Sequence, residues 1–258
     1  MKSLYITGDS HAGKMSKVLF DNMYKKYAPS EKFINVNPKD YTRRNFNICE
    51  EVVDHIDANG NKDFHVISYS LASIESEDKS ISIASTPGRS ALNLDYDFYD
   101  YTSQWDSKDS VVMPWYGYID IKNWLPQTNL NNYKNTEQVV DAYVEKTIKK
   151  FKKSKIVFIN PMPQFLVVAT TKWSVFSSDP EIQFEDRYSY HLEFTEKLKS
   201  KCISSGLDEP INISEILNAE WIEPDMQFKK PINMAYNDHL TPKYYDKILT
   251  SIISKVMI

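Results

Sequence analysis

The residues of this chain that are best suited to chemistry lie near its two ends. Gly8-Asp9-Ser10-His11 follows an apolar run typical of a β-strand, and Asp238-His239 precedes a helical pattern close to the carboxyl end. A serine hydroxyl becomes a nucleophile when a histidine takes its proton, and a strand-to-helix turn exposes the serine for attack. The two segments together predict an acyl-transfer site with Ser10 as nucleophile and His239 as general base. His11 is expected to cap or pack against the first helical turn.

In the types and order of four segments the chain resembles the SGNH (GDSL-like) hydrolase family. These segments are Gly8-Asp9-Ser10, Gly88, Gly117-Tyr118-Ile119-Asp120 and His239. The resemblance implies that the backbone N–H groups of Ser10 and Gly88 donate to the oxyanion, and it places Gly117 and Asp120 in the oxyanion and substrate region. It also implies an esterase or O-acyl hydrolase that acts on acylated carbohydrate or a similar small ester and needs no cofactor or metal.

Two positions depart from the pattern of that family. Ile119 stands where the family has its oxyanion asparagine, and Tyr236 stands where it has the acid three residues before the histidine. The nearest acid is Asp238, which is predicted to orient His239 if the backbone bends there, because neighbouring side chains of an extended chain point to opposite faces. A backbone carbonyl or Asn237 is the alternative partner of the imidazole.

The segment Gly117-Tyr118-Ile119-Asp120 is also similar to the G-E-I-D segment of SGNH-like proteins associated with bacterial surface polysaccharides. The Cys and Arg that follow in those proteins are Ile121 and Lys122 in this chain. The choice of a sugar substrate rests on this family analogy.

Apolar strands alternate with amphipathic helices along the chain. Strands are predicted over 4–7, 64–71, 80–85, 110–116, 155–160 and 211–213, and helices over 12–27, 47–56, 136–153, 185–202 and 242–256. The alternation predicts an α/β fold, a three-layer α/β/α sandwich with a mostly parallel central sheet, similar to SGNH and flavodoxin-like proteins. One domain over 1–258 is expected, with loop insertions around 30–65 and 93–109. The turns at Ser10, Gly88 and Gly117 are expected at the carboxyl ends of the strands, where such sheets bind ligands.

The bulk composition excludes several classes of function. The net charge is −4, from 31 basic and 35 acidic residues that are well mixed, so the sequence does not predict the basic surface that binds nucleic acid. No apolar run is long enough for a membrane span, and no signal peptide precedes the first strand, so a cytoplasmic protein is expected. Cys49 and Cys202, and likewise His55, His65 and His191, lack the spacing of metal ligands. The oligomeric state stays open.

Two other functions are compatible with parts of the sequence. Gly8 to Lys14 fits the G-x-x-x-x-G-K core of a phosphate-binding loop, although Met15 stands where the magnesium-binding Ser or Thr belongs. The departures at Ile119 and Tyr236 also allow a catalytically impaired SGNH-fold module with a glycan-binding or assembly role.

Overall fold

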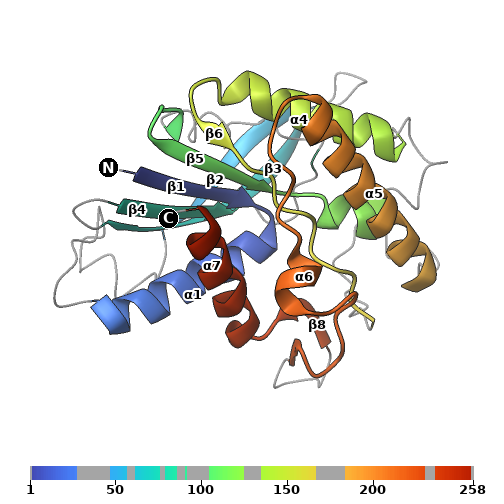
Figure 1. Ribbon diagram of the computed structural model, residues 1–258. Helices are drawn as coiled ribbons and strands as arrows, with labels where there is room; N and C mark the ends of the chain where they lie inside the picture. Colours follow the sequence, from blue (N-terminus) through green and yellow to red (C-terminus); the bar gives the residue numbers. More distant parts are fainter. Residues whose placement is uncertain are drawn as a thin grey trace.

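A six-stranded sheet forms the centre of the molecule, in the order β2-β3-β4-β1-β5-β6 (Figure 1). This computed structural model describes residues 2–27, 47–56, 62–75, 79–85, 91, 105–124, 135–166, 184–229 and 236–256. Strands β4, β1, β5 and β6 are parallel, whereas β3 and β2 extend the sheet in the antiparallel sense. The strands are β1 (Lys2–Gly8), β2 (Asn47–Ile56), β3 (Lys62–Glu75), β4 (Lys79–Ser85), β5 (Ser110–Trp115) and β6 (Lys155–Ile156).

Helices cover both faces of this sheet (Figure 1). On one face lie α1 (Ser10–Tyr27), α6 (Ile213–Leu217) and α7 (Pro242–Val256), and on the other lie α4 (Thr136–Lys150) and α5 (Phe184–Ser204). A short π-helical turn, η2 (Asp120–Trp124), follows β5, and β7 (Gln227–Lys229) pairs with β8 (Tyr236–Leu240). None of the described helices combines the length and apolarity needed to cross a membrane.

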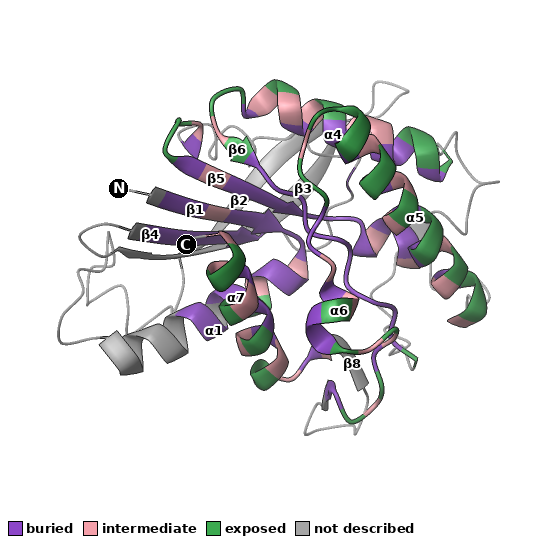
Figure 2. Cartoon of the chain, in the orientation of Figure 1, coloured by how far each residue is buried: buried purple, intermediate pink, exposed green. Residues whose placement is uncertain are grey.

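The central strands are buried on both faces, which produces two separate apolar cores (Figure 2). In β1, Leu4 and Ile6 enter the core beneath α1 and α7, while Tyr5 packs on the opposite side, where it stacks on Trp105 at 4.6 Å. Because successive side chains of a strand point to opposite faces, such a strand needs helices above and below it. The predicted three-layer α/β sandwich is therefore confirmed.

The helix expected over 47–56 is wrong. These residues form β2, which pairs with β3 in an unbroken antiparallel register from Asn47–Leu71 to Ile56–Lys62. The β-branched pair Val52 and Val53 suits a strand, and the pairing with β3 decides between two conformations that the local sequence leaves open. The range 30–65, for which a loop insertion is expected, thus contains β2 and the start of β3.

Candidate active site

Ser10 is the first residue of α1 and follows β1 through a very tight turn. A Cβ atom on Gly8 would lie 2.5 Å from the carbonyl oxygen of Trp115 and 2.9 Å from Cβ of Ala12, so only glycine fits between β5 and the start of the helix. The N–H groups of a first helical turn have no acceptor within the helix. The Ser10 N–H belongs to this set, and the positive end of the helix dipole adds to its attraction for an oxyanion.

Asp9 caps the helix that carries Ser10. Its Oδ1 accepts a hydrogen bond of 2.9 Å from the backbone N–H of His11. The carboxyl group is buried, and burial raises its pKa from 3.8 to about 7; the His11 N–H opposes this rise and the nearby Asp120 adds to it. Asp9 is therefore a carboxyl group that changes charge near neutral pH directly beneath the predicted nucleophile.

His239 lies in β8, and the fold brings it to the beginning of α1. The rings of His11 and His239 have centroids 5.2 Å apart, with planes inclined by 53°. The two ends of the chain thus meet, as the sequence predicts, but the recorded contact to His239 is made by the residue after Ser10.

His11 is buried among aromatic rings. Tyr118 meets it edge-on at 4.5 Å, and Phe165 stacks on it at 6.0 Å with 10° between the planes. The packing expected for His11 is confirmed, and it is more extensive than a contact within the first turn. The Tyr118 hydroxyl is also buried and has no hydrogen-bond partner among the described residues.

A hydrogen bond from α7 orients the His11 ring. Its Nδ1 lies 2.9 Å from the hydroxyl of Tyr245, whose oxygen accepts a hydrogen bond from the Leu240 backbone N–H. Burial lowers the pKa of His11, and the neighbouring His239, Lys122 and Lys14 lower it further, so the ring is neutral at pH 7. Burial likewise raises the pKa of Tyr245. The phenol therefore keeps its proton and can either donate to Nδ1 or accept from it, and Nε2 of His11 is a buried atom without a partner among the described residues.

Two cations near this site, the half-buried Lys122 and the buried Arg187, are not predicted by the sequence motifs. Lys122, in η2, has its pKa lowered to about 8 by burial and by the charge of Arg187. Arg187, in α5, donates from Nη2 to the Phe165 carbonyl at 2.9 Å. The charge of Lys122 helps to lower the pKa of His11, and the charge of Arg187 acts against the rise in the pKa of Tyr118 that burial causes. Arg187 belongs to no sequence pattern, because only the packing of α5 brings it here, and Lys122 is noticeable in sequence only as the second residue after the G-x-x-D segment.

Gly117 and Asp120 stabilise the turn after β5, one through its backbone conformation and the other through a hydrogen bond. Gly117 has φ +111°, and a Cβ atom there would lie 2.8 Å from both Phe194 and Pro161. Asp120 is fully buried, and its Oδ2 accepts a 2.8 Å hydrogen bond from the Ala91 N–H. Ala91 is three residues after Gly88 in the sequence, and Asp120 holds the chain at this point.

The remaining predicted residues are only partly described. Gly88 lies outside the described residues, as does the side chain of Asp238. The backbone is extended from Tyr236 to Leu240, whereas the role predicted for Asp238 depends on a bend there. Ile119 is half-buried and packs against the core beneath α1.

The phosphate-loop interpretation does not fit the structure. A phosphate loop requires the glycine-rich residues to form a loop before the helix, but α1 begins at Ser10, so Gly13 and Lys14 are already helical. Lys14 is exposed, and the Ser16 hydroxyl donates to the Gly13 carbonyl at 2.8 Å. The structure therefore does not favour this alternative, because the helix begins before the residues that would form the loop.

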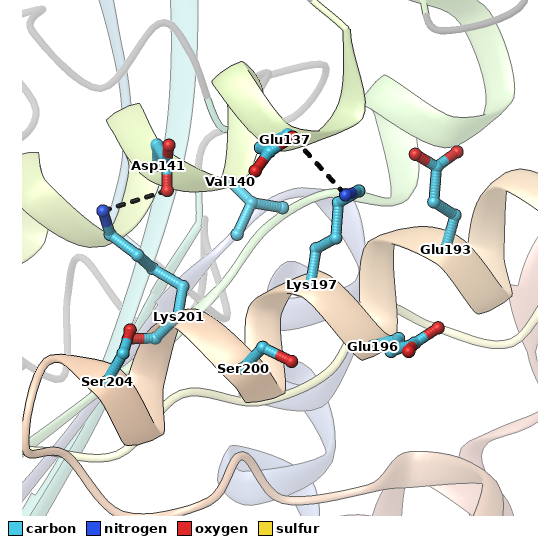
Figure 3. Close-up of a pocket in the computed structure, with 9 residues that line it drawn as sticks. All are labelled: Glu137, Val140, Asp141, Glu193, Glu196, Lys197, Ser200, Lys201 and Ser204. Atoms are coloured by element: carbon cyan, nitrogen blue, oxygen red, sulfur yellow. Dashed lines mark hydrogen bonds and ion pairs between the residues drawn. The ribbon is translucent and has the colours of Figure 1, made fainter.

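A surface groove between α4 and α5 carries charges but no nucleophile–base pair (Figure 3). Lys201 contacts Asp141 at 2.9 Å and Lys197 contacts Glu137 at 3.6 Å, between partly exposed side chains. Ion pairs that water can reach in this way contribute little to stability. The groove joins two helices on the face of the sheet opposite α1, so it does not extend the site at Ser10.

Comparisons with known proteins show the fold. No family model matches the sequence, and no curated protein sequence matches it significantly. Among solved structures, LAE5, an alpha/beta hydrolase enzyme from the metagenome of Lake Arreo, has a TM-score of 0.50 at 10% identity, over 98% of this chain and 94% of its own. A mutant of Axe2, an acetyl-xylooligosaccharide esterase from Geobacillus stearothermophilus, also has a TM-score of 0.50 at 10% identity, over 100% and 94%. At this identity the likeness concerns the fold alone.

Proposed function

We propose that this protein is a serine-dependent ester hydrolase of SGNH type that removes acyl groups, above all acetyl, from carbohydrates. Ser10 is the nucleophile and His239 the general base. The observation that carries the proposal is the 5.2 Å contact between the rings of His11 and His239, because it joins the opposite ends of the chain at the residue after Ser10.

The proposed reaction has two stages. The Ser10 hydroxyl attacks the acyl carbonyl carbon while His239 takes its proton, and the resulting oxyanion accepts a hydrogen bond from the Ser10 N–H. His239 returns the proton to the sugar oxygen as the acyl–oxygen bond breaks, which leaves an acyl-serine. Water, deprotonated by His239, then releases the acid and restores Ser10. The Gly88 N–H is the second oxyanion donor that the family resemblance implies.

His11 is assigned a positioning role for the base. Its neutral ring is held by Tyr245 and packs beside His239, which limits the orientations that the catalytic imidazole can take. Asp238 remains the sequence-based prediction for the orienting acid. Since Ile119 cannot donate to the oxyanion, and one such donor contributes roughly 10²- to 10³-fold to kcat, we expect a slow enzyme.

The substrate class is supported by fold and family likeness together. Axe2, which has the same fold, is named as an acetyl-xylooligosaccharide esterase, and the G-x-x-D segment is similar to that of proteins associated with surface polysaccharides. A fold hosts many functions, so the assignment depends on the serine chemistry being demonstrated.

Substitution of the nucleophile tests the proposal. Ser10→Ala is expected to abolish hydrolysis of p-nitrophenyl acetate and labelling by a fluorophosphonate probe, because both need the activated hydroxyl. The melting temperature is expected to stay nearly unchanged, since Gly8 and the Asp9 cap, not the Ser10 hydroxyl, form the turn.

Ser16→Ala is the matched control on the same helix. The Ser16 hydroxyl is already engaged with the Gly13 carbonyl, so its loss is expected to leave both labelling and hydrolysis in place. Undiminished turnover or labelling in a folded Ser10→Ala variant would remove Ser10 as the nucleophile and overturn the proposal.

A further inference from the structure

Three aromatic side chains gather at the surface where α5 begins and where the chain leaves α6. Phe184 and Tyr188 stack with centroids 5.6 Å apart and 16° between their planes, and Trp221 meets each of them edge-on at 6.1 Å. All three side chains are partly exposed, and neither of the two cores formed by the described residues includes them. These rings, which we call the aromatic platform, therefore do not serve to fill the interior.

Carboxylates fix the polar ends of the platform. The Tyr188 hydroxyl donates to Glu220 at 3.3 Å, and the Trp221 indole N–H donates to Glu223 at 2.5 Å. Rings held in this way lose little conformational freedom when a ligand stacks on them.

The charge around the platform selects the kind of ligand. The one basic residue of this part of α5, Arg187, is buried and donates to the Phe165 carbonyl. Among the residues that the structure describes in these two segments, the exposed charged ones are acidic: Glu185, Asp186, Glu220, Glu223 and Asp225. An acidic rim repels anions such as nucleic acid, but its carboxylates accept hydrogen bonds from hydroxyl groups. Aromatic faces bounded by such acceptors match a neutral sugar, whose C–H face is apolar and whose edge carries hydroxyls.

Backbone connections link the platform to the site at Ser10. Phe165, which stacks on His11, forms a parallel bridge with Ile222, the residue after Trp221. The Phe165 carbonyl accepts from Arg187, the residue before Tyr188. The neighbours of Trp221 and of Tyr188 in sequence thus both contact the backbone of Phe165, the residue whose ring packs on His11.

We infer that Phe184, Tyr188 and Trp221 bind a neutral sugar of an oligosaccharide whose acylated unit lies at Ser10. The inference rests on the proposed function and narrows its substrate class from small esters to glycan chains.

Substrates of different length test this inference. Trp221→Ala and Tyr188→Ala are each expected to lower kcat/KM for acetylated xylo-oligosaccharides by roughly threefold to tenfold, the factor expected for one lost aromatic contact. Hydrolysis of p-nitrophenyl acetate is expected to stay unchanged, because this ester is too small to reach the platform. Ile203→Ala, which removes an exposed apolar side chain near the far end of α5, is the control and leaves both substrates unaffected. Melting curves identify any variant that does not fold.

A binding experiment separates this inference from the proposed function. Deacetylated xylo-, chito- and manno-oligosaccharides are titrated into Ser10→Ala and into Ser10→Ala combined with Trp221→Ala, and calorimetry follows binding in the absence of catalysis. Binding that requires Trp221 supports the platform even if Ser10 proves not to be the nucleophile. Equal binding by both proteins, or no binding of any of the three glycans, overturns the inference. A dimer of the parent protein that Trp221→Ala dissociates also overturns it, because the rings would then bind a second copy.

Discussion

Asp9 combines two tasks that make opposite demands on one carboxyl group. As the cap of α1 it accepts the His11 N–H, which favours the charged form, but its burial beside Asp120 favours the neutral form. Burial dominates, and the pKa rises to about 7. The residue before the predicted nucleophile is therefore charged or neutral according to pH.

The pH dependence of stability is expected to reveal this carboxyl group. Its pKa is higher in the folded than in the unfolded protein, so the folded state binds more protons between about pH 4 and pH 7, and its contribution to stability is lost as pH rises through that window. Asp9→Asn keeps a side chain that can cap the helix and removes the titration. Urea unfolding at pH 5 and pH 8 is expected to show a smaller loss of stability in the variant than in the parent protein. Equal losses in the two proteins would mean that Asp9 is charged throughout.

The charge and orientation of His11 likewise depend on the residues that surround it. His11 is neutral because it is buried among aromatic rings and near cations, and Tyr245 holds it in one orientation. The His11 ring packs beside His239, and we therefore assign any effect of His11 on catalysis to the positioning of that ring.

At the scale of elements, the turn between β5 and η2 sets the position of the segment that contains Asp120. Gly117 has a positive φ and lies against Phe194 of α5 and Pro161, so this turn, the loop after β6 and α5 pack in mutual contact. A change at Gly117 therefore disturbs α5 as well as the turn.

Gly117→Ala is expected to lower the free energy of unfolding by about 2–5 kcal/mol, through the unfavourable φ and the collision with Phe194 and Pro161. Gly206→Ala is the matched control, because Gly206 also has a positive φ, of 75°, but a Cβ atom there meets nothing within 4 Å. The control is expected to cost about 1–2 kcal/mol. Denaturant unfolding measures both, and equal losses would show that the contact with α5 does not restrict this turn.

At the scale of the whole molecule, the two cores share one sheet. Leu4 and Ile6 of β1 pack beneath α1 and α7, whereas Val112 of β5 packs beneath α4 and α5. Because β1 and β5 are neighbours, neither core can lose its sheet while the other keeps it. The single domain predicted from the sequence should therefore unfold as one unit.

Core truncations on opposite faces test this prediction. Ile248→Ala in α7 and Leu198→Ala in α5 are each expected to cost about 2–5 kcal/mol, because both side chains are fully buried. In each variant, circular dichroism and tryptophan fluorescence are expected to report the same shifted midpoint. Two transitions that respond separately to the two substitutions would instead indicate two folding units.

The sequence by itself determined the fold class and the elements that hold the predicted site residues. Alternating apolar strands and amphipathic helices predicted the three-layer sandwich, because their periods of two and 3.6 residues are local properties that burial on both faces of a sheet requires. The position of Ser10 at a strand-to-helix turn was predicted in the same way, from the apolar run before Gly8 and the helical pattern after His11. The meeting of the two ends of the chain was predicted from the order of the segments.

Only the tertiary structure decided the surroundings of those residues. The segment 47–56 is a strand because it pairs with β3. Tyr245, Lys122 and Arg187 lie in the region around His11, although their elements are far apart in sequence. The raised pKa of Asp9 and the lowered pKa of His11 depend on burial, which no local pattern specifies. Charge and orientation at this site arise from packing between segments, and therefore they could not be predicted from residue types and spacing alone.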